Sequence, residues 1–392
     1  MHPRTLITLC CGLLLVGCIQ PRPALAAPRA GGQNPPTSSI AAQPDQIVDG
    51  FPIWLGKDRT LDRVVVLVEG FDLQNAMTAP ALLRLVAPAA ERLLAEGMDL
   101  LVVDFPDSHL LPDALAPLVA RAVQTASRTT HDSSVAVVGL SAGGIVARWA
   151  LVTAELAGKP LPVHTLLLFD CPNRGARLNP SLQALAIRYG VKQDREALTS
   201  DSARALIQEI PTDVDWKRVG PPIPSARRRV PTDCKPDGSQ CTAFFNRLWA
   251  LNDRRGYPGK CRVLAVSQGS RKATNERGTL YRMWLPAGQG WELQMDEADC
   301  APGSLLPQLL AIRFRIRMPL GIAGAYLRSL PTFIPTESAL DCRPGETPPF
   351  DAWYARSDDA PPIAHDSIDP GAVAFVVNAL LEAQGRRETV AK

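Results

Sequence analysis

The feature that most constrains the fold is the run Gly139-Leu140-Ser141-Ala142-Gly143, because of the segments on either side of it. Residues 134–138 form a short apolar run rich in valine, which is typical of a buried parallel strand. Residues 144–156 carry apolar side chains at helical spacing and end near Gly158, a residue type that often follows a helix. Glycines on both sides of Ser141 let a strand and a helix pack closely around a sharp turn. The pattern predicts a strand–turn–helix unit that lifts the Ser141 hydroxyl above the edge of a sheet; an ordinary turn between a strand and a helix is the alternative.

Segments typical of strands and helices alternate along much of the chain. The expected buried strands are residues 61–68, 100–103, 135–138, 164–169 and 261–266. The expected helices outside the unit around Ser141 are residues 79–96, 113–126 and 372–381. This alternation predicts an α/β fold with a mostly parallel sheet and helices on both faces.

The alternation stops between residues 172 and 258, which we interpret as an insertion that separates a first core part, residues 46–171, from a second, residues 259–392. The insertion contains the turn-rich stretch 220–224 and the basic run Arg227-Arg228-Arg229. Because it falls between two strands at the carboxyl edge, we expect it to lie over Ser141 as a cap. A surface excursion without a role is the alternative.

Two later segments have distinct patterns. Residues 279–285 and 291–295 are expected to form a hairpin outside the main sheet. Residues 305–325 alternate arginine with apolar residues around position 314, which suits a half-buried strand or a face that contacts a membrane.

The N-terminus has the features of an export signal over residues 1–18, with a basic start followed by an apolar stretch of signal-peptide length. Its end, Leu15-Val16-Gly17-Cys18, resembles a bacterial lipobox, in which the cysteine is lipidated. Ala24-Leu25-Ala26 offers a competing cleavage site for ordinary secretion. Residues 19–45 have the composition of a flexible tether. We expect a protein anchored to the cell envelope through Cys18, with a soluble periplasmic or secreted form as the alternative.

Charge and cysteine content narrow the class of protein further. The formal net charge is +3, so the composition does not point to a nucleic-acid partner. Of the nine cysteines, six follow the export signal, and an even number in an oxidising compartment predicts disulfides: Cys171, Cys234, Cys241, Cys261, Cys300 and Cys342. A bridge between Cys234 and Cys241 would close a small loop. Zinc is the alternative, but no C-x2-C pair is present after the signal, so we expect no metal and no cofactor.

Two segments carry a resemblance to a known family. Gly139-Leu140-Ser141-Ala142-Gly143-Gly144 and the later Asp170-Cys171-Pro172-Asn173-Arg174-Gly175-Ala176 resemble the α/β-hydrolase superfamily on its lipase and esterase side. Lipases commonly carry a T-P-H-R-G-like turn at the second place. Residues 335–339 are also similar to a late lipase segment in which an Asp-Gly pair precedes the proline, but Leu330-Pro331-Thr332 stands in its place here. Glu69-Gly70 likewise replaces the common His-Gly.

The resemblance implies a nucleophilic serine, a histidine and an acid, following one another in the order Ser, acid, His. The resemblance makes Ser141 the expected nucleophile. His365 alone among the five histidines lies beyond the last predicted sheet strand and before the final helix, which suits the catalytic base; an exposed loop histidine is the alternative. Asp170 closes a strand at the carboxyl edge beside Ser141, so we favour it as the acid over Asp341.

An oxyanion hole would complete such a site. The resemblance implies the backbone N–H of Ala142 and one from the loop after strand 61–68, where we choose Phe71. Asp72 and Asn75 nearby either shape the approach of a substrate or cap the following helix.

The expected function is an exported serine hydrolase that cleaves carboxylic esters, of small molecules or lipids, through an acyl-enzyme at Ser141. Acyl transfer and the cleavage of thioesters or amides use the same groups. The alternative from another class is a non-catalytic surface lipoprotein that keeps the fold as a binding module.

Overall fold

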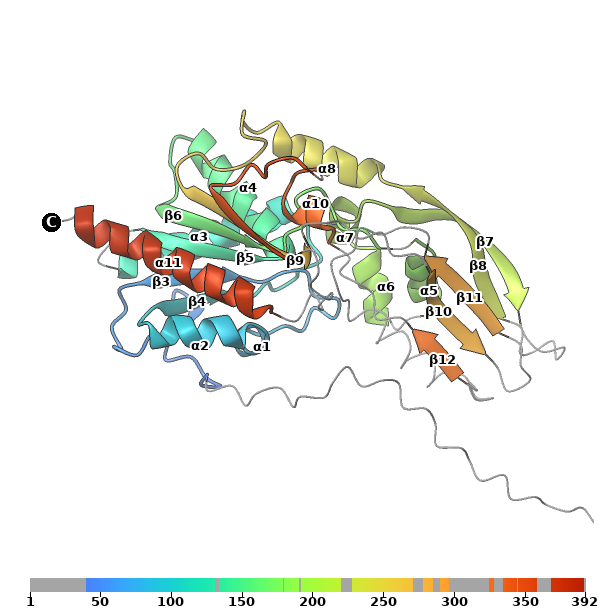
Figure 1. The fold of residues 1–392 in the computed structure, drawn as a ribbon, viewed down its shortest axis with the longest axis horizontal. Coiled ribbons are helices and arrows are strands. Elements are labelled where there is room, and N and C mark those ends of the chain that lie inside the picture. The colour runs from blue at the N-terminus through green and yellow to red at the C-terminus, as the bar shows by residue number, and fades with distance from the viewer. Residues whose placement is uncertain are drawn as a thin grey trace, which may run out of the picture. The chain divides into compact units, whose positions relative to one another are not determined.

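The main structural element is an eight-stranded sheet with the strand order β1-β2-β4-β3-β5-β6-β9-β13. Its central strands β4, β3, β5, β6 and β9 are labelled in Figure 1. The computed structural model describes residues 40–130, 134–178, 180–189, 192–219, 228–270, 278–284, 290–295, 324–327, 334–343, 345–357 and 368–390. The strands of the sheet are β1 (Gln46–Val48), β2 (Phe51–Trp54), β3 (Val64–Val68), β4 (Asp99–Val103), β5 (Val135–Leu140), β6 (Val163–Phe169), β9 (Arg262–Ser270) and β13 (Ala352–Arg356). β2 is antiparallel to β1 and β4, and the pairs from β4 to β13 are parallel, which confirms a mostly parallel sheet.

The five strands predicted from the sequence are all present in this sheet. β3, β4 and β5 are buried at every position, because helices cover both faces of the sheet. β5 extends two residues beyond its prediction, through Gly139 and Leu140. The strand therefore runs directly into the turn at Ser141.

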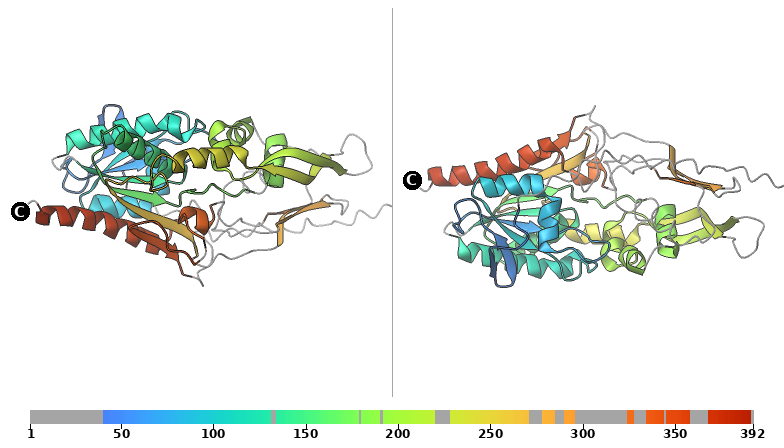
Figure 2. Two further views of the ribbon diagram at one scale, coloured as in Figure 1. Left: turned by 90° about the horizontal axis from the view of Figure 1, so that it is seen from above. Right: turned by 90° about the horizontal axis from the view of Figure 1, so that it is seen from below.

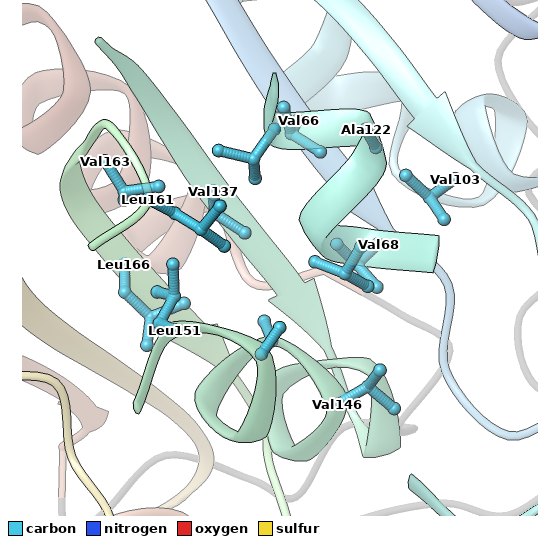
Figure 3. Packing of buried hydrophobic residues seen from close by; sticks show 14 of the residues in the cluster. Val66, Val68, Val103, Ala122, Val137, Val146, Leu151, Leu161, Val163 and Leu166 are labelled. Atoms are coloured by element: carbon cyan, nitrogen blue, oxygen red, sulfur yellow. The ribbon is translucent and has the colours of Figure 1, made fainter. Parts of the chain in front are cut away.

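Alternate side chains of the central strands enter two separate hydrophobic clusters. Val66 and Val68 of β3 belong to the first cluster, and Val65 and Leu67 belong to the second, as the two-residue period of a strand requires. Helices α3 (Pro112–Thr129) and α4 (Ala142–Leu156) complete the first cluster, part of which is drawn in Figure 3.

Helices α1 (Ala79–Leu85), α2 (Ala87–Ala95) and α11 (Pro370–Val390) complete the second cluster on the opposite face. Figure 2 shows α11 and α2 on one side of the sheet and α3 and α4 on the other. Helices on both faces are thus confirmed. The single helix expected over residues 79–96 is divided at Val86, because Pro88 lacks the N–H that a continuous helix needs at that position.

The residues between β6 and β9 form the insertion. It contains α5 (Pro180–Tyr189), α6 (Lys192–Leu198), α7 (Asp201–Leu206), the antiparallel pair β7 (Ile210–Val219) and β8 (Arg228–Asp237), and α8 (Ser239–Trp249). Its return helix α8 packs on the core, since Phe244 and Leu248 share a buried cluster with Ile145 of α4. Its role as a cap stays a prediction, and the stretch 220–227 lies outside the described residues.

A separate three-stranded sheet contains β10 (Gly278–Trp284), β11 (Gly290–Met295) and β12 (Gly324–Leu327). β10 and β11 are antiparallel neighbours, which confirms the predicted hairpin outside the main sheet. The arginine-alternating stretch around position 314 lies outside the described residues, as do residues 1–39 with the export signal and Cys18. Within the described part of the chain, no helix combines the length and the apolar character that a membrane span needs.

The predicted disulfide between Cys234 and Cys241 is wrong for this structure, in which both residues are free thiols. The reason is their location: Cys234 on β8 lies 3.4 Å from the Ser181 hydroxyl, whereas Cys241 is buried on α8 in the cluster with Leu206. Cys171, Cys261 and Cys342 are also free, and Cys300 lies outside the described residues.

Candidate active site

Ser141 occupies a strained turn between β5 and α4. Its backbone has φ 49° and ψ −126°, a conformation that a residue with a side chain adopts at an energetic cost. The Ser141 N–H donates to the Phe169 carbonyl at 2.8 Å, and the Ser141 carbonyl accepts from the Gly144 N–H at 3.1 Å. These bonds join the turn to the end of β6 and to the first turn of α4, so the structure contains the predicted strand–turn–helix unit.

Glycines make this turn possible because backbone segments meet without room for a side chain. A Cβ on Gly139 would lie 2.3 Å from the Gly144 Cα, where the strand and the helix touch. A Cβ on Gly143 would lie 2.1 Å from the Glu69 carbonyl oxygen, at the end of β3. The close packing inferred from the motif is therefore a contact of three segments: β5, α4 and the loop after β3.

The loop after β3 brings Gly70 and Phe71 to the serine. A Cβ on Gly70 would lie 3.0 Å from the Ser141 Cβ, so the Gly70 backbone is a direct neighbour of the serine. Ala142 is the first residue of α4, where an N–H has no acceptor within the helix. In the part of the chain that the structure describes, no group accepts a hydrogen bond from the Phe71 N–H. The two N–H groups chosen as the oxyanion hole thus belong to the residue after Ser141 and to the residue after its neighbour Gly70.

Asp72 and Asn75 hold this loop rather than capping α1. The Asp72 carboxylate accepts hydrogen bonds from the N–H groups of Gln74 at 3.0 Å and Met77 at 2.7 Å, and also from Ala76. Asn75 accepts from the Ser108 N–H at 2.8 Å. These contacts fold residues 72–77 into a compact turn against the loop that follows β4.

The sequence did not single out two residues that contact the serine turn or the loop with Phe71: Cys171 contacts Ser141 itself, and His109 contacts Phe71 and Asp72. The His109 Nε2–H donates to the Asp72 carbonyl at 2.9 Å, and its ring lies 5.4 Å from the Phe71 ring. The Cys171 thiol lies 2.8 Å from the Ser141 carbonyl. Each lies in the segment after the carboxyl end of a predicted strand, His109 after β4 and Cys171 after β6. That position was the signal in the sequence that could have pointed to them.

Glu69 is a buried carboxyl immediately before Gly70 and Phe71 in the loop after β3. It is 2% exposed, and its Oε2 accepts from the Phe105 N–H at 2.5 Å. Burial is the main cause that raises the pKa of Glu69 to about 8; the bond from Phe105 opposes the rise, and the negative charges of Asp72 and Asp104 add to it. Glu69 is therefore mostly protonated at pH 7.

Asp170 follows β6 directly and is fully buried with φ 46°. Its N–H donates to the Val266 carbonyl at 2.8 Å, and its Oδ1 accepts from the Gln268 N–H at 3.1 Å. The residue before it accepts from the Ser141 N–H, and the residue after it contacts the Ser141 carbonyl. The structure therefore places Asp170 next to the serine turn, at the same edge of the sheet.

Asp341 is also buried but belongs to a different set of contacts. Its Oδ1 accepts from Arg174 Nε at 2.7 Å and lies 3.2 Å from Arg255 Nη2. Its Oδ2 accepts from the Tyr257 hydroxyl at 3.0 Å. Both oxygens are thus used in joining the segment after α10 (Thr336–Ala339) to the loops around β6 and β9.

His365 lies outside the described residues, but the residues that flank its loop are described. β13 runs parallel to β9, and Arg356 near its end pairs with Ser270. On the other side of the loop, Ile368 lines a small apolar cavity together with Leu140 and Phe169, the residues that precede Ser141 and Asp170. The described residues on either side of positions 358–367 thus lie toward the edge of the sheet that carries Ser141.

The comparisons with known proteins give structural likenesses only. No protein-family model and no curated protein sequence matches the chain. Among solved structures it is similar to lipase BlEst2 of Bacillus licheniformis in its propeptide form, with 15% identity and a TM-score of 0.34; the match covers 57% of this chain and 40% of that chain. Est1E from Butyrivibrio proteoclasticus has 13% identity and a TM-score of 0.35, covering 88% of this chain and 99% of that one. Aspergillus fumigatus lipase B has 23% identity and a TM-score of 0.25, covering 31% and 27%.

The fold itself follows from the topology of this chain. Parallel strands from β4 to β13 support helices on both faces, and the strained serine follows the central strand β5 and precedes a helix. A serine on such a turn at the top of a mostly parallel sheet is the nucleophile elbow of α/β-hydrolases. The chain has the α/β-hydrolase fold, with an elbow formed by residues 139–144.

Proposed function

We propose that this protein is a serine hydrolase that cleaves carboxylic esters through an acyl-enzyme at Ser141. The single observation that carries the proposal is the elbow: a serine at φ 49°, with the Gly70 backbone against its Cβ and with Asp170 following the neighbouring strand. Strain of this kind in a residue that is neither glycine nor asparagine is characteristic of functional sites. The strain therefore favours a catalytic serine over a non-catalytic binding module.

The proposed reaction has two steps, formation of the acyl-enzyme and its hydrolysis. His365 takes the proton of Ser141 as the serine oxygen attacks the ester carbonyl carbon, and the Phe71 and Ala142 N–H groups stabilise the resulting oxyanion. The intermediate collapses, the ester C–O bond breaks, and the alcohol leaves with the proton from His365. Water then attacks the acyl-enzyme with His365 again as base, which releases the carboxylic acid and restores Ser141. Asp170 orients His365 and stabilises its charged form.

A fluorophosphonate probe tests the nucleophile directly. We expect intact-mass analysis of the purified protein to show one covalent adduct, and peptide mapping to place it on Ser141. Ser141→Ala should lose both the adduct and the hydrolysis of short p-nitrophenyl esters, while its thermal unfolding stays within a few degrees of wild type. Ser239→Ala, a change at an exposed serine at the start of α8, is the matched control and should label normally.

Two results would overturn the proposal. One is a wild-type protein that takes up no probe and hydrolyses no ester in a panel of chain lengths. The other is a Ser141→Ala variant that hydrolyses esters at the wild-type rate. Addition of hydroxylated acceptors to the same assay separates hydrolysis from acyl transfer, because a transferase would form the new ester in preference to the free acid.

We also propose that the protein is exported and anchored through a lipid on Cys18. The support is the sequence alone, a lipobox-like end to an export signal followed by a tether. The site would then work outside the cytoplasm.

A further inference from the structure

We propose that His109 is a positioning residue that fixes the oxyanion hole of this protein, an inference that rests on the proposed hydrolase function. His109 lies in the loop after β4, 37 positions from the Asp72 carbonyl that its ring contacts. His109 is not part of the elbow motif or of the proposed triad. It also supplies neither of the two N–H groups of the proposed oxyanion hole.

His109 contacts two residues of the loop after β3, Phe71 and Asp72. Its Nε2–H donates to the Asp72 carbonyl at 2.9 Å, and since a carbonyl only accepts, this nitrogen carries the proton. Its ring lies against Phe71, with centroids 5.4 Å apart and planes inclined by 34°. The neighbouring Ser108 hydroxyl accepts from the Asp72 N–H at 3.1 Å. Both backbone groups of Asp72 are therefore held by two consecutive residues of the loop after β4.

His109 is itself held in place by two backbone bonds. Its N–H donates to the Asp107 carboxylate at 3.0 Å. Its carbonyl accepts from the Ser202 N–H in the first turn of α7 at 3.0 Å. The imidazole is thus anchored both in its own loop and to the insertion. His109 therefore links α7, through its backbone, to Asp72, the residue next to Phe71.

The Phe71 N–H of the proposed oxyanion hole needs to be held from outside because a glycine, Gly70, precedes it. A glycine permits more backbone conformations than any other residue, so the backbone of Gly70 does not fix the direction of that N–H. Stabilisation of a developing oxyanion depends on donors that are already in place when the charge appears. On the other side of Phe71, the bonds to Asp72 remove this freedom. His109 thereby sets the direction of the Phe71 N–H without touching the substrate.

Two variants of His109 separate its hydrogen bond from its ring. His109→Phe keeps an aromatic ring against Phe71 but removes the donor to Asp72. His109→Gln removes the ring, but its side-chain amide can place a donor close to the position of Nε2. Both are compared with wild type in ester hydrolysis and in fluorophosphonate labelling. The final extent of labelling gives the fraction of active sites, and its time course gives the rate for each active site.

We expect His109→Phe to lower kcat and the labelling rate for each active site by about tenfold to a hundredfold, less than the loss of an oxyanion donor itself. KM and the fraction of active sites should stay within about threefold of wild type. His109→Gln should restore both rates to within about threefold. A bound trifluoromethyl ketone, which mimics the oxyanion, should lose affinity in His109→Phe by the same factor as kcat.

The other outcomes contradict the inference in different ways. Wild-type rates in His109→Phe, or an equal loss in His109→Phe and His109→Gln, show that the bond to Asp72 does not position the hole. A lower fraction of active sites with an unchanged rate for each site shows a purely structural role. A wild-type protein that is never labelled at Ser141 overturns the hydrolase proposal, and this inference with it.

Discussion

Asp170 and Asp341 show how two buried aspartates with the same backbone conformation differ through their partners. Both have a positive φ, 46° and 47°; Asp170 directly follows β6, and Asp341 lies two residues after α10. Asp341 accepts from a tyrosine and two arginines, whereas Asp170 follows the residue that binds the Ser141 N–H. The assignment of Asp170 as the triad acid stays a prediction, and these contacts favour it because they give Asp341 a structural task.

The first prediction separates the two aspartates by substitution. Asp170→Asn should lower kcat by about 10⁴, as the loss of a triad carboxylate does, with little change in stability. Asp341→Asn should keep kcat within a small factor and lower the free energy of unfolding by about 1–3 kcal/mol, because it weakens hydrogen bonds from charged partners. Ester kinetics and urea unfolding of both variants check this. Normal turnover in Asp170→Asn, together with a large loss in Asp341→Asn, would exchange the two assignments.

The second prediction concerns Glu69 and pH. The pKa of Glu69 is raised from 4.5 to about 8 in the folded protein, so the folded state keeps a proton that the unfolded chain releases. The free energy of unfolding then falls as the pH rises from about 4.5 to about 8, and this contribution is constant above that pH. Glu69→Gln keeps a neutral side chain of the same shape and removes this loss. The variant should therefore gain stability relative to wild type across that window.

Thermal unfolding between pH 4 and pH 9 measures this difference. We expect the melting temperatures of wild type and Glu69→Gln to be similar near pH 4 and to differ by several degrees near pH 8. Glu96→Gln, a change at an exposed carboxylate after α2, should show no such trend. A constant difference at every pH would mean that Glu69 has an ordinary pKa in the folded protein.

At the scale of elements, the elbow is a junction where β5, α4 and the loop after β3 exclude side chains from one another. Gly143 contacts the Glu69 carbonyl, and Gly139 contacts Gly144. Geometry at Ser141 therefore depends on residues that carry no functional group. The insertion adds a further constraint, since Phe244 of α8 stacks on Trp149 of α4, with ring centroids 5.5 Å apart.

The third prediction compares two glycines at opposite ends of α4. Gly143→Ala would place a methyl group 2.1 Å from a backbone oxygen, so the elbow must open. We expect a loss of stability of about 3 kcal/mol or more and a loss of fluorophosphonate labelling, since overpacking here shifts the backbone. Gly158 has φ +70° with open space around it, so Gly158→Ala should cost about 1 kcal/mol through backbone strain alone.

Denaturant unfolding and probe labelling of both variants check the comparison. Gly158→Ala should label at the wild-type rate. Equal stability losses with normal labelling in both variants would show that α4 can move away from β3 without disturbing Ser141.

At the scale of the whole molecule, the order of the strands brings distant segments to one edge of the sheet. β3, β5 and β6 are neighbours, so the loop with Phe71, the elbow with Ser141 and the turn with Asp170 meet there, although up to about a hundred residues separate them along the chain. β4 and the insertion add His109 and α7 to the same region. The site is thus a property of the sheet and not of any single segment.

The fourth prediction concerns the attachment of this molecule to a membrane. If Cys18 is lipidated, Cys18→Ser should move the protein from the membrane fraction to a soluble fraction of the producing cells, because the lipid bond needs the thiol. Incorporation of a labelled fatty acid and the mass of the mature N-terminus check it. A wild-type protein that is soluble and begins at Ala27 would support ordinary signal cleavage after Ala26 instead.

Local patterns allowed a large part of this protein to be predicted. Five strands of the main sheet, the helices that cover its faces, the hairpin outside it and the elbow around Ser141 follow from periodicity, β-branched runs and glycine spacing, which act over a few neighbouring residues. The break at Val86 was missed although Pro88 marks it, because the apolar period continues across the proline. The positions of Ser141 and Asp170 at one edge could be inferred, since parallel strands end together.

Contacts between distant segments were decided only by the tertiary structure. The bond from His109 to Asp72 joins two loops, the partners of Asp341 come from two segments, one after β6 and one before β9, and Cys234 and Cys241 remain apart. No local pattern encodes these contacts, because they depend on which strands are neighbours in the sheet and on how the insertion packs against α4. Burial gave Glu69 its raised pKa for the same reason: the sequence shows a carboxyl beside a glycine, and only folding removes its water.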